Sequence, residues 1–413
     1  MSDKQEEDIM QNNSTIKKKS LFQKESPTKF HVGYYNIHED VSLNFQMNRW
    51  ISLLGGDSLE EMKAIAPKIK NYADWKREFL ALAEKSLSSG KTLAAAYYIR
   101  SAEFFTFADS PDKKFLRERF LKLVAEEYAD TGLKKHLIPY TDGFESGFLP
   151  AYRLTPEDPK GTIVVCGGFD AYIEELFPLM LSIAGHGYDV ISFDGPGQGG
   201  ALEEYGLSMT HEWEKPVKAV LDYFRTGEVT LIGMSLGGYL AVRAAAYEPR
   251  VLRVIAYDVM YNFMESYLKN VSDFSRFILK TALAAGLSAP VNALIAKKAK
   301  TSPLIEWGIR QGMHVTGTAT SFACLRAIEK YTTKNISGLV RQDVLLMAGS
   351  EDHYVPVDQL YSQSRALTNT RSLTMRLFTR AEHAQNHCQV GNMGLAAETI
   401  LAWTASMSDH QAS

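Results

Sequence analysis

One serine with glycine neighbours, set between a strand and a helix, constrains this chain more than any other feature. Residues 228–235 (EVTLIGMS) are a short apolar run that predicts a buried strand, and the segment GGYLAVRAAAYEP that follows predicts a helix. The run Gly-Met-Ser-Leu-Gly-Gly joins the two at residues 233–238. Small neighbours let the strand and helix approach closely, so a G-x-S-x-G turn in this context projects its serine as a nucleophile. The sequence therefore predicts Ser235 as a nucleophile.

The rest of the second half of the chain repeats this strand–helix alternation. Short Val/Ile-rich runs separated by amphipathic helices are typical of a parallel sheet with helices on both faces. We therefore predict an α/β fold with a doubly wound, mostly parallel sheet. The predicted strands are two in the stretch HLIPYTDGFESGFLPAYRLTPED and one each at 161–168, 188–195, 228–235, 252–260, 342–350 and 371–379.

Two helical regions accompany the predicted sheet. Apolar residues recur at helical spacing through residues 42–130, which predicts a helical N-terminal domain, and mostly helical patterns interrupt the strand alternation at 261–335, which predicts a lid. The polar N-terminal segment lacks the apolar residues of a folded domain and predicts disorder. The predicted organisation is a tail at 1–29, an N-terminal domain at 30–134, a first core part at 135–260, a lid at 261–335 and a second core part at 336–413.

Composition excludes several other classes of protein. The chain has 413 residues, 45% of them hydrophobic, a net charge of −3 and three cysteines. The chain has no excess of positive charge, which a nucleic-acid-binding protein would need. The three cysteines give neither a disulfide framework nor the spacing of zinc ligands. We find no secretory signal or membrane-spanning run and expect a cytoplasmic protein with no metal, no cofactor and no membrane or nucleic-acid partner. The helical N-terminal domain is a candidate surface for a homodimer.

A serine nucleophile near neutral pH needs a base and an acid that orients the base. On a sheet of this kind the acid and then the base follow the serine along the chain. Asp352 comes directly after the predicted strand at 342–350, where the sheet presents groups to a ligand. The neighbouring Glu351 is the competing candidate for the acid.

The predicted base lies in the loop after the last strand. This loop, FTRAEHAQNHCQVGN, carries His383 and His387, and residue patterns alone do not separate the two. His353 follows the predicted acid directly and is expected to line the pocket.

Two backbone N–H groups are also needed, because charge develops on the carbonyl oxygen when a serine attacks it. One is expected from Leu236, the residue after the nucleophile. The other is expected from Phe169, in the loop after the strand at 161–168, where two glycines allow close backbone approach. The glycine-rich run at 193–199 lacks both the phosphate-loop and the dinucleotide-binding spacing, and we interpret it as a tight structural turn.

Five motifs stand out along the chain: GGFDAYIEEL, FDGPGQG, GMSLGGYLAVRAA, GSEDHYVP and EHAQNHCQVGN. Together they resemble the α/β-hydrolase superfamily, in particular the group that includes dihydroxypseudooxynicotine hydrolase. The resemblance covers roughly residues 45–405, and it implies a serine hydrolase with an N-terminal helical domain that cleaves a carbon–carbon bond or an ester.

The resemblance also implies roles for individual residues. The group's base stands directly before Cys-Gln, which implies His387 rather than His383. The group shows a G-G-x-D-x-x-K-E pattern, and here Ile173 replaces the lysine and Glu174 stands at the acidic position. We therefore regard Glu174, and also His383 as the histidine not chosen for the base, as candidates for substrate binding.

The function expected from these observations is hydrolysis of a carbonyl-containing small molecule through Ser235, His387, Asp352 and an acyl-enzyme, with an aromatic ketone or polyketide as the substrate class. Three alternatives use the same fold. They are a peptidase like the oligopeptidases, an isomerase or cyclase that does not hydrolyse, and a ligand-binding module.

Overall fold

The computed structural model describes residues 30–409, so the predicted disordered tail at 1–29 lies outside the described residues. The described chain contains an eight-stranded sheet with the order β1-β2-β4-β3-β5-β6-β7-β8. Its strands are β1 (Lys134–Thr141), β2 (Ser146–Leu154), β3 (Thr162–Cys166), β4 (Asp189–Phe193), β5 (Val229–Met234), β6 (Val251–Tyr257), β7 (Asp343–Gly349) and β8 (Ser372–Phe378). All of the strands predicted from the sequence are present.

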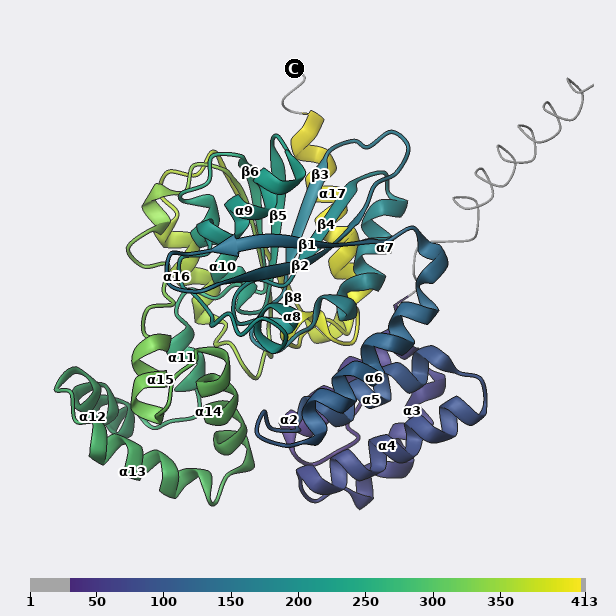
Figure 1. The fold of residues 1–413 in the computed structure, drawn as a ribbon. Coiled ribbons are helices and arrows are strands. Elements are labelled where there is room, and N and C mark those ends of the chain that lie inside the picture. The colour runs from purple at the N-terminus through teal and green to yellow at the C-terminus, as the bar shows by residue number, and fades with distance from the viewer. Residues whose placement is uncertain (1–29, 410–413) are drawn as a thin grey trace, which may run out of the picture.

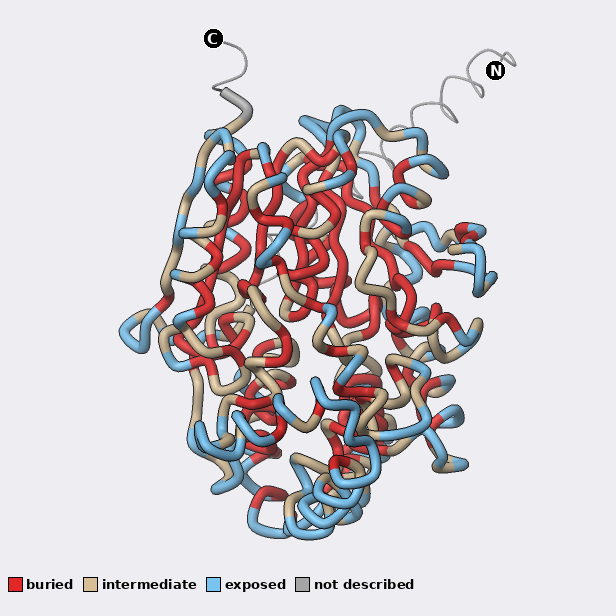
Figure 2. The backbone as a smooth tube through the Cα atoms, turned by 90° about the vertical axis from the view of Figure 1, so that its left-hand side faces the viewer, coloured by how far each residue is buried: buried red, intermediate tan, exposed pale blue. Residues whose placement is uncertain are grey.

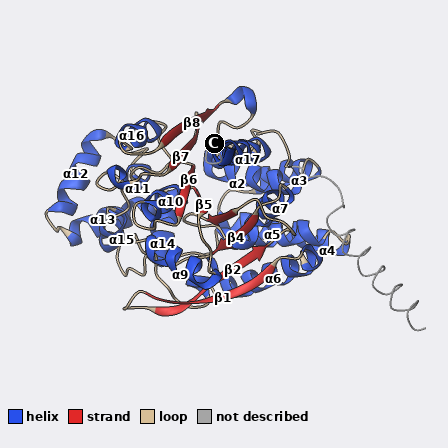
Figure 3. Ribbon diagram, turned by 90° about the horizontal axis from the view of Figure 1, so that it is seen from above, coloured by secondary structure: helices blue, strands red, loops and turns tan. Residues whose placement is uncertain are grey.

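Most of the sheet is parallel. The strands from β3 to β8 pair in parallel with their neighbours, whereas β1 pairs antiparallel with β2, and β2 pairs antiparallel with β4. Helices cover both faces (Figures 1 and 3). The covering helices are α7 (Phe177–Gly185), α8 (Gly199–Glu203), α9 (Glu214–Phe224), α10 (Gly237–Ala245), α16 (Asp358–Ala366) and α17 (Met393–Asp409). The predicted fold class is confirmed.

Alternation along each central strand divides the core between the two faces. In β3, Ile163 and Val165 pack in the cluster that includes residues of α7 and α17, and Val164 and Cys166 pack in the cluster that includes residues of α9 and α10. Successive side chains of a strand point to opposite faces, so a run of apolar residues fills both layers. Figure 2 shows the result as a buried centre beneath exposed outer loops.

The N-terminal helices pack on the α7/α17 face and share its apolar cluster. They are α2 (Val41–Leu54), α3 (Asp57–Ile65), α4 (Tyr72–Ser88), α5 (Thr92–Phe104) and α6 (Asp112–Glu127). Short 3-10 turns lie in this region at Ala66–Lys68 and Ala129–Thr131, and another lies before β7 at Ser337–Leu339. Among the described residues, no helix is both long and apolar enough to cross a membrane.

The segment between β6 and β7 is helical, as the interruption of the strand pattern predicts. It contains α11 (Phe263–Tyr267), α12 (Asp273–Ala284), α13 (Ser288–Ala299), α14 (Pro303–Val315) and α15 (Ser321–Ile328). It lies below the sheet in Figure 1, next to the N-terminal helices. The two regions touch where the Trp307 ring stacks on Phe104 at 5.3 Å and its Nε1–H donates to the Phe104 carbonyl at 3.4 Å.

Candidate active site

Ser235 lies in a sharp turn between β5 and α10. Its φ is +60°, a left-handed conformation that non-glycine residues adopt rarely and often at functional sites. The turn is held by the Ser235 N–H, which donates to the Tyr257 carbonyl at 2.7 Å. A Cβ added to Gly233 would lie 1.8 Å from the Gly237 carbonyl oxygen, so the strand and helix pass each other at a distance that excludes a side chain there. These contacts account for the glycines of the motif.

His387 connects Ser235 to Asp352. Its Nε2 lies 2.8 Å from Ser235 Oγ, and its Nδ1 lies 2.6 Å from Asp352 Oδ2. An ionised carboxylate only accepts hydrogen bonds, so Nδ1 carries the proton and Nε2 is left to accept from the serine hydroxyl. Asp352 is fixed in turn, because its Oδ1 accepts from the Tyr354 and Val355 amides at 2.7 and 2.9 Å.

The other candidates from the sequence are not part of the hydrogen-bonded series of Ser235, His387 and Asp352. His383 is exposed on the same loop, so the structure brings His387 and not His383 to Ser235. Glu351 is exposed and pairs with Arg380. His353 packs its ring against Phe45 at 4.7 Å, and burial lowers its pKa to about 3.

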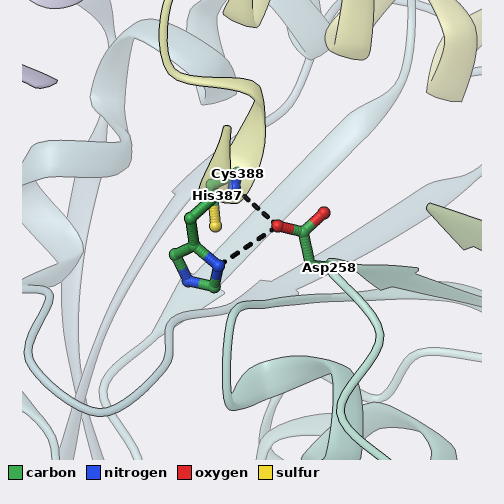
Figure 4. Close-up of side chains that lie close together, drawn as sticks. All are labelled: Asp258, His387 and Cys388. Atoms are coloured by element: carbon green, nitrogen blue, oxygen red, sulfur yellow. Dashed lines mark hydrogen bonds and ion pairs between the residues drawn. The ribbon is translucent and has the colours of Figure 1, made fainter. Parts of the chain in front are cut away.

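A second carboxylate, which the sequence analysis missed, lies beside the imidazole. Asp258 follows β6 directly, and its Oδ2 lies 3.3 Å from His387 Nδ1 (Figure 4). The same oxygen accepts from the Cys388 amide at 2.6 Å, and Oδ1 accepts from Gln389 Nε2 at 2.8 Å. An aspartate at the carboxyl end of a buried strand is the signal that could have identified it, as it did for Asp352.

Three possible metal ligands meet at this point. One ligand atom each of Asp258, His387 and Cys388 lies within 4.8 Å of the others in the described part of the chain. However, the His387 Nδ1 and both Asp258 oxygens already make hydrogen bonds or ion pairs to protein groups. The protein contacts therefore account for this cluster without a metal.

The loop after β3 approaches the serine closely. A Cβ on Gly168 would lie 2.9 Å from Ser235 Cβ and 3.1 Å from the Leu236 nitrogen. Among residues 30–409, neither the Phe169 amide nor the Leu236 amide donates to another protein group. Two free N–H groups therefore flank the region next to Ser235.

Gln198 supports this loop and is a second residue that the sequence analysis missed. Its Nε2 donates to the carbonyls of Gly167 and Gly168 at 2.8 and 2.9 Å, and its Oε1 accepts from the Gly195 amide at 3.0 Å. The glycine-rich run at 193–199 is therefore more than the structural turn that we predicted, because it fixes the backbone next to Phe169. A lone glutamine in a turn carries no sequence signal for such a role.

Two arginines of the N-terminal helices, of which Arg100 is buried, hold the other side of the loop. Arg100 Nη2 donates to the Asp170 carbonyl at 2.6 Å, and its Nε donates to Glu175 Oε1 at 2.7 Å. Arg49 forms ion pairs with Glu175 and Asp170. Burial alone would raise the pKa of Glu175, but Arg100 and Arg49 bring it below its usual value. The N-terminal helices thus fix the loop that carries Phe169.

Glu174 lies inside the protein. It is 4% exposed, and its Oε2 has no hydrogen-bond partner among the described residues. Burial raises its pKa, and burial together with the charge of Glu174 raises the pKa of Asp194 to about 8. The structure therefore places Glu174 next to a second buried carboxyl group, and not among the residues that line the cleft described below.

This pair makes stability depend on pH. The folded protein keeps a proton on Asp194 up to about pH 8, whereas an unfolded aspartate loses it near pH ~4, so the free energy of unfolding falls as pH rises across that window. Glu174→Gln removes the like charge and lowers the pKa of Asp194. We expect it to raise the free energy of unfolding by about 1 kcal/mol at pH 7.5 and to change it little at pH 4.5.

Urea unfolding at the two pH values measures this effect. The exposed Glu157→Gln is the matched control, because it removes one negative charge without touching the pair. An equal gain in stability for both variants, or a gain for Glu174→Gln that does not change with pH, would contradict the assignment.

A cleft lies between the N-terminal helices, the loop after β3 and the helical segment between β6 and β7. Its walls combine aromatic rings with buried charged groups, and neither Ser235 nor His387 is among the residues that line it. Phe169 belongs both to this cleft and to the loop that faces Ser235. The residues that line the cleft are Arg100, Phe104, Lys113, Phe169, Asp170, Ala171, Tyr172, Gly197, Gly199, Leu202, Glu203, Trp307 and Gln311.

Solved structures share this architecture. The 2,6-dihydroxy-pseudo-oxynicotine hydrolase superposes with a TM-score of 0.59 at 20% identity, covering 86% of this chain and 94% of that one. The AbyA5 wild-type structure superposes with a TM-score of 0.65 at 18% identity, covering 90% and 95%. At these identities the likeness concerns the fold.

Sequence comparison gives the family. The chain is 30% identical to the hydrolyase poxO of Penicillium oxalicum, over 73% of this chain and 79% of that protein. It is 29% identical to the 20-hydroxy-prefusarin hydrolase FUS2 of Gibberella moniliformis, over 72% and 80%. The model of the alpha/beta hydrolase fold matches residues 161–386. The chain therefore belongs to the α/β-hydrolase family and is a hydrolase.

Proposed function

We propose that this protein is a serine hydrolase in which Ser235 is the nucleophile, His387 the base and Asp352 the acid that orients the base. The observation that carries the proposal is the continuous hydrogen-bonded series from Ser235 Oγ through His387 to Asp352, which starts at a serine held in a left-handed turn. This arrangement activates a hydroxyl that is otherwise a poor nucleophile.

The reaction proceeds through an acyl-enzyme. His387 Nε2 takes the hydroxyl proton as Ser235 Oγ attacks the carbonyl carbon of the substrate, and the negative charge on the carbonyl oxygen is stabilised by the Phe169 and Leu236 N–H groups. When the tetrahedral intermediate collapses, His387 gives its proton to the leaving group. Water then attacks the acyl-enzyme while His387 takes its proton. When this second intermediate collapses, His387 gives the proton to Ser235 Oγ, and a carboxylic acid and free Ser235 are released.

The proposed substrate is a carbonyl-containing small molecule, cleaved either at an ester or at a carbon–carbon bond next to a ketone. In the second case the bond breaks to leave an enolate, so the substrate needs a carbonyl or a phenol beside the broken bond, and the His387 proton goes to carbon. Aromatic rings of Phe104, Phe169, Tyr172 and Trp307 line the cleft next to the loop that approaches Ser235, and they support an aromatic or polyketide-like compound. One relative is named as a hydrolase of 20-hydroxy-prefusarin, and this name supports a substrate other than a peptide.

Labelling with a fluorophosphonate tests the proposal directly. The probe reacts with an activated serine, so mass spectrometry of the labelled protein is expected to find the adduct on Ser235. Aryl esters and β-diketones are then tested as substrates, and a product that has gained one water separates hydrolysis from isomerisation. Folded protein that neither reacts with the probe nor turns over any of these compounds would favour the ligand-binding alternative.

A further inference from the structure

The imidazole of His387 lies between two carboxylates rather than next to one. Strands β6 and β7 are neighbours in the sheet, with Tyr257 opposite Met347, so the aspartates after their carboxyl ends reach the same loop. Asp352 Oδ2 lies 2.6 Å from His387 Nδ1, and Asp258 Oδ2 lies 3.3 Å from the same atom. Figure 4 shows the Asp258 carboxylate aimed at the ring from the side of β6.

We infer that Asp258 is a positioning residue for the catalytic base, which shares the His387 Nδ1 proton with Asp352 and takes over that hydrogen bond when Asp352 is lost. This inference rests on the proposed function, because it assigns a second partner to the base named there.

The surroundings of Asp258 fit an ionised acceptor. It is 1% exposed, and its contacts are all donors: the Cys388 amide at 2.6 Å, Gln389 Nε2 at 2.8 Å and His387 Nδ1. A buried carboxylate is costly unless a positive charge compensates it. Among residues 30–409 no lysine or arginine forms an ion pair with Asp258, so the imidazolium of His387 is the positive charge that it contacts.

Loss of Asp352 would strengthen the role of Asp258. Burial raises the pKa of Asp258, and the negative charge of Asp352 raises it further. Removal of the Asp352 charge therefore favours the ionised form of Asp258. The hydrogen bond from Nδ1 can then pass to Asp258 without a change of tautomer, because Asp258 is already within 3.3 Å.

Two carboxylates also change the pH at which the base works. Burial lowers the pKa of His387, but Asp352, Cys388 and Asp258 together raise it well above its usual value. A base must be unprotonated before it can accept the serine proton, so the reaction rate rises as pH passes the pKa of His387. The titratable or charged groups around the ring are Asp258, Lys269, Asp352, His353, Tyr354 and Cys388.

Asp258→Asn is the variant that separates this role from simple packing. The asparagine keeps the size of the side chain, and Gln389 Oε1, which has no partner among the described residues, can turn to accept from the new amide. Loss of one negative charge lowers the pKa of His387. The rate of fluorophosphonate labelling at Ser235 is measured against pH. We expect the rising limb of this pH profile to move to lower pH by about half a unit or more.

The controls use matched changes of charge. Asp158→Asn, at an exposed position, removes one negative charge and is expected to leave the pH profile unchanged. Asp258→Glu restores a carboxylate and is expected to move the limb back towards the wild-type pH. Thermal melting of each variant shows whether it is folded.

The takeover by Asp258 is tested in a second pair of variants. Asp352→Ala leaves Asp258 as the acceptor for Nδ1, so it is expected to keep labelling at least about 10-fold faster than Asp352→Ala combined with Asp258→Asn. An unchanged limb in Asp258→Asn, or equal rates for the single and double variants, would overturn the inference. Wild-type protein that is not labelled at Ser235 would instead overturn the proposed function.

Discussion

Ser235→Ala is expected to abolish hydrolysis, with kcat lowered by ~10⁴-fold or more. The hydroxyl is the atom that forms the acyl-enzyme, and no neighbouring group can replace it at the same distance from His387 Nε2. The fold is expected to survive, because the backbone contacts of the turn come from the Ser235 amide and carbonyl and remain in the alanine variant. Turnover of an aryl ester, together with the melting temperature, measures both effects.

The two histidines of the same loop provide the matched comparison. His387→Ala is expected to lose about as much activity as Ser235→Ala, because the serine and its base act as one unit. His383→Ala is expected to stay near wild type, because that side chain is exposed and the ring that lies next to Ser235 Oγ is that of His387. The opposite result, an inactive His383→Ala with an active His387→Ala, would show that the base has been wrongly assigned.

The fold could be predicted because its signals are local. Each central strand is a short apolar run, and helical patterns stand between the strands, so the alternation predicts a parallel sheet before any contact is known. Ser235 and Asp352 follow from the same logic, since each stands at the carboxyl end of a strand whose boundary can be read from the sequence.

The remaining site residues depend on the path of the chain in space. His383 and His387 share one loop, and residue patterns cannot show which of them turns inward. Cys388 and Gln389, which follow His387, both have φ values of +48°. A positive φ is usually signalled in a sequence by a glycine, and neither residue is one. The family resemblance favoured His387 for a different reason, its place before Cys-Gln.

Long-range pairs were equally hidden. Arg100 and Glu175 are 75 positions apart, and each by itself looks like an ordinary charged residue of a helix. Asp258 directly follows a strand, which by itself does not distinguish it. Its place next to His387 depends on β6 and β7 being neighbours in the sheet. A motif can predict which atoms react, whereas the groups that hold those atoms require the structure.

Gly168→Ala tests whether the backbone next to Phe169 has to lie where the structure places it. A methyl group at Gly168 would come within 2.9 Å of both the Met234 carbonyl oxygen and Ser235 Cβ, so the loop has to move away from the serine. The Phe169 N–H then no longer reaches the oxygen on which charge develops. We expect kcat to fall by ~10²-fold or more, because removal of one such donor costs about that much.

Gly167→Ala is the control, one residue earlier on the same loop. There the added methyl group meets Ala171 Cβ at 3.6 Å, an ordinary van der Waals contact, and kcat is expected to stay within a few-fold of wild type. Both variants remove one glycine from the same loop, so a general loss of flexibility would affect them alike. Equal activity of the two would show that the Phe169 amide does not stabilise the oxyanion. A large loss confined to Gly168→Ala, with KM little changed, would place that amide at the transition state, because an interaction made only there lowers kcat without raising KM.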